Sequence, residues 1–141
     1  MNAEPPVVLR FDEEQRAYRP GEPLSGDYWI ESLPAEQIKA IEVSVLWHTE
    51  GKGDEDMAVH EFWRREARAD QPVDPHAPER FSTTLPNSPL SYEGQIVKVR
   101  WCVRVRVFPV HGKELVCEKR FQLGSVPGVA IRAAATPAPN E

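Results

Sequence analysis

The segment from Arg80 to Gly124 constrains the fold most, because its middle alternates between apolar and polar residues. The residues of one parity form an apolar set: Val97, Val99, Trp101, Val103, Val105 and Val107. The residues of the other parity are mostly basic: Ile96, Lys98, Arg100, Cys102, Arg104 and Arg106. A period of two with β-branched residues predicts a strand that is buried on one side only. A second apolar layer must therefore cover the valine face.

Shorter runs with strand character predict the rest of a sheet structure. They lie at residues 7–11, 24–30, 38–49, 57–65, 81–85 and 115–123. Helical signals are scarce, and the best window, 62–70, lacks a sustained period of 3.6. This spacing predicts an all-β protein, an antiparallel immunoglobulin-like β-sandwich of about seven or eight strands. We expect the sandwich to span 1–125 and the Ala/Pro-rich segment 126–141 to be a flexible tail.

Length and charge narrow the class of protein. A chain of 141 residues fits one domain, and 40% apolar residues are enough for a core. The formal net charge of −5 argues against nucleic acid as a partner, because duplex binding needs a basic surface. No apolar run reaches the ~20 residues of a transmembrane segment, and the N-terminus lacks the features of a secretory signal. We therefore expect a cytoplasmic protein.

Two motifs occur in a fixed order before the long alternating strand. The first is Tyr18-x-Pro-Gly-Glu-x-x-x-Gly26. The second is Leu85-Pro-Asn-Ser-Pro-Leu-Ser-Tyr-Glu-Gly94, which leads directly into the long alternating strand. Each motif alone is common, but their order and spacing, from about Val7 to Leu123, resemble those of the N-terminal domain of arrestins.

The resemblance implies an immunoglobulin-like sandwich that acts as an adaptor, without catalytic activity and without a cofactor. Because open sandwiches expose edge strands, we expect a protein partner to bind through sheet edges, loops and a basic strand face, and the exposed connection 66–79 to contribute. Arrestin-related proteins normally carry two sandwiches, and this chain has room for one. A phosphate-sensing switch between two domains therefore does not carry over. The oligomeric state stays open.

The basic stripe, which comprises Lys98, Arg100, Arg104 and Arg106, is the first candidate partner-binding surface. Its side chains follow one another along one face of the predicted strand, where they could receive an acidic or phosphorylated segment. The alternative is a solvated face that acids on the neighbouring strand neutralise. Matching the apolar faces of the last two strands places Glu118 opposite Cys102 and Glu114 opposite Arg106, which favours this alternative.

Exposed aromatic residues support a different class of function. Trp29 falls on the polar side of its strand, between Asp27 and Glu31, and is the second candidate contact with a partner. With Tyr92, it could instead bind a small ligand or a sugar ring. A small-ligand or carbohydrate-binding sandwich is therefore the alternative function.

The two cysteines are predicted to lie on opposite faces, Cys102 outside and Cys117 inside, so a disulfide between them is disfavoured. Neighbouring arginines could lower the pKa of Cys102, but its place in the middle of a strand favours a structural thiol.

Metal and catalytic sites find little support in the sequence. The acidic loop 51–56 lacks the oxygen ligands of a calcium cage, and His48 and His60 alone are weak evidence for zinc. No nucleophile motif, phosphate loop or metalloprotease motif occurs.

Overall fold

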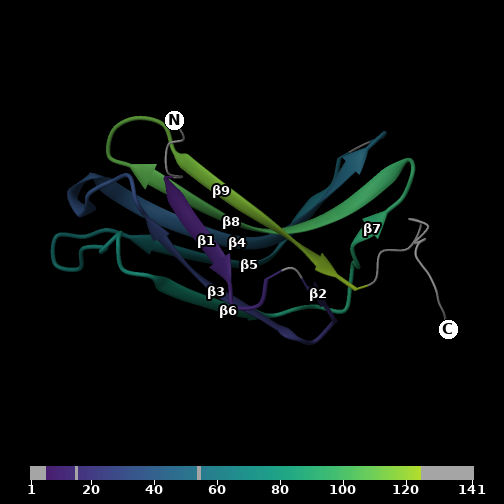
Figure 1. The fold of residues 1–141 in the computed structure, drawn as a ribbon. Coiled ribbons are helices and arrows are strands. Elements are labelled where there is room, and N and C mark those ends of the chain that lie inside the picture. Colours follow the sequence, from purple (N-terminus) through teal and green to yellow (C-terminus); the bar gives the residue numbers. More distant parts are fainter. Residues whose placement is uncertain (1–5, 15, 54, 125–141) are drawn as a thin grey trace, which may run out of the picture.

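The computed structural model describes residues 6–14, 16–53 and 55–124 and consists of nine strands and one 3-10 turn (Figure 1). The elements are β1 (Val7–Phe11), β2 (Ala17–Tyr18), β3 (Pro23–Ile30), the turn η1 (Ala35–Gln37), β4 (Ile38–Gly51), β5 (Met57–Glu66), β6 (Glu79–Thr84), β7 (Tyr92–Glu93), β8 (Val97–Pro109) and β9 (Leu115–Leu123). The predicted tail, 126–141, lies outside the described residues.

Two sheets pack against each other, and the predicted sandwich is confirmed. The small sheet has the order β1-β3-β6, and the large sheet has the order β2-β9-β8-β4-β5, with β7 beside β8 (Figure 1). The pairs are antiparallel except for β2 with β9, which is parallel. The two-residue strands β2 and β7 are too short to show a periodicity, so the sequence did not predict them.

The inner face of β8 forms the centre of the core, as the alternation predicts. Trp101 is 1% exposed, and Val103, Val105 and Val107 are fully buried. Leu24, Tyr28 and Ile30 are buried on β3 of the small sheet and belong to the same core cluster. Each fully buried valine contributes about 1.5–3 kcal/mol, so this face stabilises the sandwich strongly.

The two motifs that carry the resemblance to arrestins lie side by side and are hydrogen-bonded. The Gly21 N–H donates to the Leu85 carbonyl oxygen, and the Leu85 N–H donates to the Glu22 carbonyl oxygen, each at 2.9 Å. Gly26 is required by close approach, because a Cβ there would lie 2.0 Å from the Arg10 carbonyl oxygen on β1. Through these hydrogen bonds and this close approach, the motifs hold β3 and the turn before it against neighbouring segments.

The connection between β5 and β6 is mostly exposed, as its prolines and charges predict, but two of its residues are buried. Val73 is 3% exposed and belongs to the core cluster, and Pro75 is also buried. The Pro75 carbonyl oxygen accepts a hydrogen bond of 2.7 Å from the Ile30 N–H at the end of β3. A single apolar residue among charges gives no periodic signal, so the sequence does not reveal this anchor.

The register of β8 with β9 differs by two residues from the predicted one. Glu118 lies opposite Arg104 rather than Cys102, and Val116 rather than Glu114 lies opposite Arg106. A shift of two residues keeps every side chain on its face, so matching apolar faces cannot detect it. The turn sets the register, because β8 runs to Pro109 before the chain reverses.

Candidate functional site

The structure places the four residues of the basic stripe together and Trp29 elsewhere. Lys98, Arg100, Arg104 and Arg106 lie on the outer face of β8, the side of the large sheet that faces away from the core. Trp29 lies on β3 in the small sheet. The five residues therefore do not form one site.

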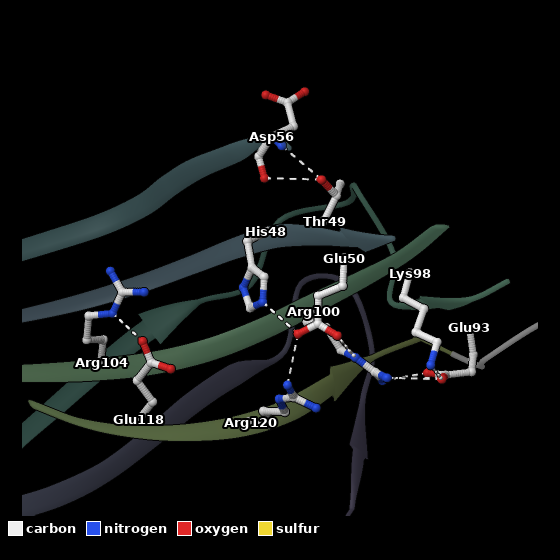
Figure 2. A network of polar contacts seen from close by, with 10 residues as sticks. All are labelled: His48, Thr49, Glu50, Asp56, Glu93, Lys98, Arg100, Arg104, Glu118 and Arg120. Carbon is white, nitrogen blue, oxygen red and sulfur yellow. Dashed lines mark hydrogen bonds and ion pairs between the residues drawn. The ribbon is translucent and has the colours of Figure 1, made fainter. Parts of the chain in front are cut away.

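Figure 2 shows that carboxylates surround one end of the stripe. Glu93 on β7 contacts both Lys98 Nζ, at 3.2 Å, and Arg100 Nη2, at 3.0 Å (Figure 2). Glu50 on β4 accepts from His48 Nε2, at 3.0 Å, and from Arg120 Nη2, at 2.9 Å, and its second oxygen lies 3.4 Å from Arg100 Nε. These contacts join four strands, β4, β7, β8 and β9, into one charged network.

The other end of the stripe is paired in the same way. Arg104 Nε donates to Glu118 at 2.5 Å, across the β8–β9 pair (Figure 2). Arg106 donates to Glu114 at 2.7 and 3.0 Å, and lies 3.9 Å from Glu42. The predicted pair of Arg106 with Glu114 is present, although Val116 and not Glu114 is its register partner.

The pairing stabilises the charged form of the acids. The hydrogen bond from His48, followed by that from Arg100 and by the positive charge of Arg120, lowers the pKa of Glu50 below its ordinary value. Arg100 and Lys98 lower the pKa of Glu93, and Arg106 lowers that of Glu114. Every cation of the stripe thus has a carboxylate partner, which favours the self-neutralised interpretation. That the stripe binds a partner stays a prediction.

Beneath this network, the outer face of the large sheet has a small apolar centre. Leu46 on β4 and Cys102 on β8 are register partners, and each is 1% exposed. Burial raises the pKa of the Cys102 thiol to about 11, so the thiol stays protonated at neutral pH and is a poor nucleophile. The structural role that the sequence favours for Cys102 fits this position, and the lowered pKa does not occur. Cys117 lies on the inner face, against the core.

The outer face of β5 has an exposed apolar strip that the sequence did not single out. Met57, Val59 and Phe62 are 54%, 48% and 50% exposed. These side chains lie beside the buried pair Leu46 and Cys102, because Val59 is the register partner of Leu46. We call Met57, Val59 and Phe62 the β5 strip.

Among the residues that the structure describes, the backbone of β5 pairs with a neighbour on one side only, because β5 ends the strand order of the large sheet. The Ala67 N–H donates to the Lys39 carbonyl oxygen at 3.0 Å, next to the Ala40–Glu66 register pair. Since antiparallel hydrogen bonding alternates, Arg65, Trp63 and Glu61 bond to β4 as Ala67 does. The N–H and C=O groups of Phe62, Arg64 and Glu66 therefore point to the open edge.

A groove of about 490 Å³ runs between the β5 edge and the β6 edge of the small sheet. Its apolar lining includes Tyr28, Trp63 and Phe81, and its charged lining consists of Arg64, Arg65, Arg80 and Glu79. Ion pairs join Arg65 to Glu79, at 2.9 Å, and Arg80 to Asp12, at 2.6 Å. An extended segment that pairs with β5 would place alternate side chains into this groove.

The aromatic residues proposed for a small ligand lie in different surroundings. Trp29 is half-buried rather than exposed as the sequence predicts. Its Nε1 donates to Glu31 at 2.7 Å, and the Arg10 guanidinium lies 4.7 Å from the ring centroid. Tyr92 is 40% exposed and lines a cleft of about 570 Å³. The cleft is also lined by aromatic rings from other strands: Phe11, Tyr18, Trp101 and Phe121.

The histidines of the β4–β5 hairpin do not converge. His48 faces the outer network, whereas His60, at the β-bulge of β5, lies 2.8 Å from the Thr84 carbonyl oxygen on β6 and packs edge-on against Trp101. Among residues 6–14, 16–53 and 55–124, no group of three or more His, Cys, Asp or Glu side chains is placed to hold a metal ion. The same residues contain no helix that is long and apolar enough to span a membrane.

The order of the strands, the two hydrogen-bonded motifs and the packing of the two sheets define an arrestin-like β-sandwich. Among solved structures, the chain is similar to Spo0M, a sporulation control protein from Bacillus subtilis, with a TM-score of 0.60 and 19% sequence identity. The match covers 84% of this chain and 49% of Spo0M, so the chain spans about half the length of that protein. No family model matches the sequence, and the comparison with curated proteins gave no match.

Proposed function

We propose that the protein is a non-enzymatic adaptor that holds an extended segment of a partner protein along the open edge of β5. One observation carries this proposal: the outward-facing backbone of β5 and the exposed β5 strip occur on the same strand. Main-chain hydrogen bonds to an added strand supply affinity, and side-chain contacts supply selectivity. The arrestin-like fold is consistent with a regulatory or adaptor role.

The chemistry of the site suggests what the segment would contain. Its side chains on the outer face would meet the apolar β5 strip, and those on the inner side would enter the groove between β5 and β6. The lining of this groove holds three arginines and one glutamate. Each of these arginines already contacts a carboxylate of its own chain, so a segment with apolar residues that cover the β5 strip fits best.

A matched pair of variants tests the proposal. Val59→Lys places a charge on the β5 strip, whereas Val116→Lys places the same charge on β9, at a valine of nearly equal exposure, 49% against 48%. Each tagged chain would be incubated with native cell extract, and bound proteins would be quantified by mass spectrometry. We expect a partner that wild type and Val116→Lys retain and Val59→Lys loses. Equal retention by all three chains would contradict the proposal.

The cleft at Tyr92 supports a second candidate function, the binding of a small aromatic or sugar-like ligand. Its volume of about 570 Å³ is typical of such sites, and the exposed Tyr92 and the half-buried Phe121 contribute aromatic surface to it. A ligand screen by differential scanning fluorimetry, with Tyr92→Ala as the control, tests this function. A hit whose thermal shift survives Tyr92→Ala would not be bound in this cleft.

A further inference from the structure

The exposed edge of β5 has a pattern of side chains that is complementary to itself. Trp63 is the centre of the pattern. Two positions away on either side lie an acid and a base, Glu61 and Arg65, and one position away lie an aromatic ring and a cation, Phe62 and Arg64. A strand of this kind can pair with an antiparallel copy of itself, with opposite charges facing each other.

We propose that two copies of the chain pair β5 against β5 about a two-fold axis at Trp63. In this register, Glu61 of each copy faces Arg65 of the other, and Phe62 faces Arg64. The direction of the backbone groups is consistent with this register, because the N–H and C=O groups of Phe62 and Arg64 point to the open edge. The inference depends on the same edge as the proposed function and adds a second copy of the chain as an occupant.

The charges favour this register over its neighbours. Moving the axis to Arg64 would place the two Arg64 side chains opposite each other, and moving it to Phe62 would place Glu61 opposite Trp63. Glu61 also lacks a compensating cation in its own chain: among the described residues it forms no ion pair, and it accepts a hydrogen bond from Thr83 Oγ1. Arg65 of a second copy would supply that cation.

The apolar strip supports the same arrangement. Phe62, at 50% exposure, would be covered by the Arg64 side chain of the second copy, whose guanidinium can stack on an aromatic ring. The pairing would also close the edge to other segments. Self-association would therefore regulate the proposed adaptor, since a partner segment must displace the second copy.

The test measures mass against concentration for the full chain by sedimentation equilibrium. Wild type is expected to shift from monomer to dimer between low and high micromolar concentration, as a small interface allows. Phe62→Lys should stay monomeric, because it places a lysine opposite Arg64. Val116→Lys, a matched control away from the edge, should dimerise as wild type does. Thermal melting would confirm that each variant is folded.

A charge exchange tests the register. Glu61→Arg alone and Arg65→Glu alone should each weaken dimerisation about tenfold, because the two-fold axis places the Glu61–Arg65 pair in the interface twice and each variant loses both copies. The double variant restores opposite charges across the axis and should recover most of this loss. Because Arg65 also contacts Glu79, a Glu79→Gln variant serves as a control for loss of the contact within the chain.

Three results would overturn the inference: a monomer at every concentration, a dimer that Phe62→Lys leaves intact, or single reversals that the double variant does not rescue. These results are separate from failure of the proposed function. A monomer whose Val59→Lys variant still loses a partner would overturn the dimer and leave the adaptor. A β5–β5 dimer without any partner that depends on Val59 would overturn the adaptor and leave the dimer.

Discussion

Two neighbouring parts of the large sheet's outer face are built in opposite ways. Over β4, β8 and β9, the buried pair Leu46 and Cys102 lies amid a network in which every cation of the basic stripe contacts a carboxylate. One strand away, β5 exposes apolar side chains and an unpaired backbone edge. The comparison shows that the most charged surface is already satisfied by its own chain. The β5 edge, by contrast, leaves apolar side chains exposed, and it is where we propose that a partner binds.

The largest expected difference between the two parts is in stability. Leu46→Ala should lower the free energy of unfolding by about 2–5 kcal/mol, because it leaves a cavity at a buried site. Val59→Ala, at the register partner of Leu46, should change it by less than about 0.5 kcal/mol, because the side chain is half exposed. Urea unfolding of both variants would measure this. Equal losses in the free energy of unfolding would show that Val59 is packed as tightly as Leu46.

The outer face over β4, β8 and β9 should also protect the Cys102 thiol from alkylation. Burial and a pKa of about 11 keep Cys102 protonated and inaccessible, so iodoacetamide should modify it only after unfolding. Peptide mass spectrometry of native and urea-treated protein would quantify the modification. Rapid alkylation of Cys102 in the native protein would mean that the network opens easily.

Acid should weaken the network before it affects the β5 strip. Because the folded-state pKa values of Glu50 and Glu93 are below the ordinary 4.5, their stabilising contribution is complete above pH 4.5 and is lost as the pH falls below it. The melting temperature should fall over this range, and Glu50→Gln should reduce the slope. Phe62→Lys serves as the control and should leave the slope unchanged. A Glu50→Gln slope equal to that of wild type would exclude Glu50 as a contributor.

The smallest effect is expected from reversing the stripe. Arg100→Glu with Arg104→Glu breaks partly exposed ion pairs, which usually contribute little, and leaves the β5 edge untouched. Partner retention should therefore stay at the wild-type level in the pull-down. Loss of the partner in this variant, with retention by Val59→Lys, would move the binding surface from the β5 edge to the stripe.

The sequence predicts well what depends on local periodicity. The valines and Trp101 of β8 lie on the inner face, and the stripe lies on the outer face, as alternation requires. The sequence does not predict features that depend on pairing between segments far apart in the chain. The position of β5 at the end of the large sheet depends on its neighbours in space, so the exposure of Phe62 cannot be read from its own segment. The β8–β9 register is missed because a shift of two residues keeps every side chain on its face, and the buried Val73 is missed because a single apolar residue gives no periodic signal.

The anchor at Val73 and Pro75 has a consequence for recognition. One end of β5 continues from the hairpin with β4, and the other leads into a connection that is held in the core and bonded to Ile30. The edge is thus fixed at both ends before any segment arrives. A pre-organised template loses little conformational freedom on association, so a short segment with few anchoring side chains would suffice to bind.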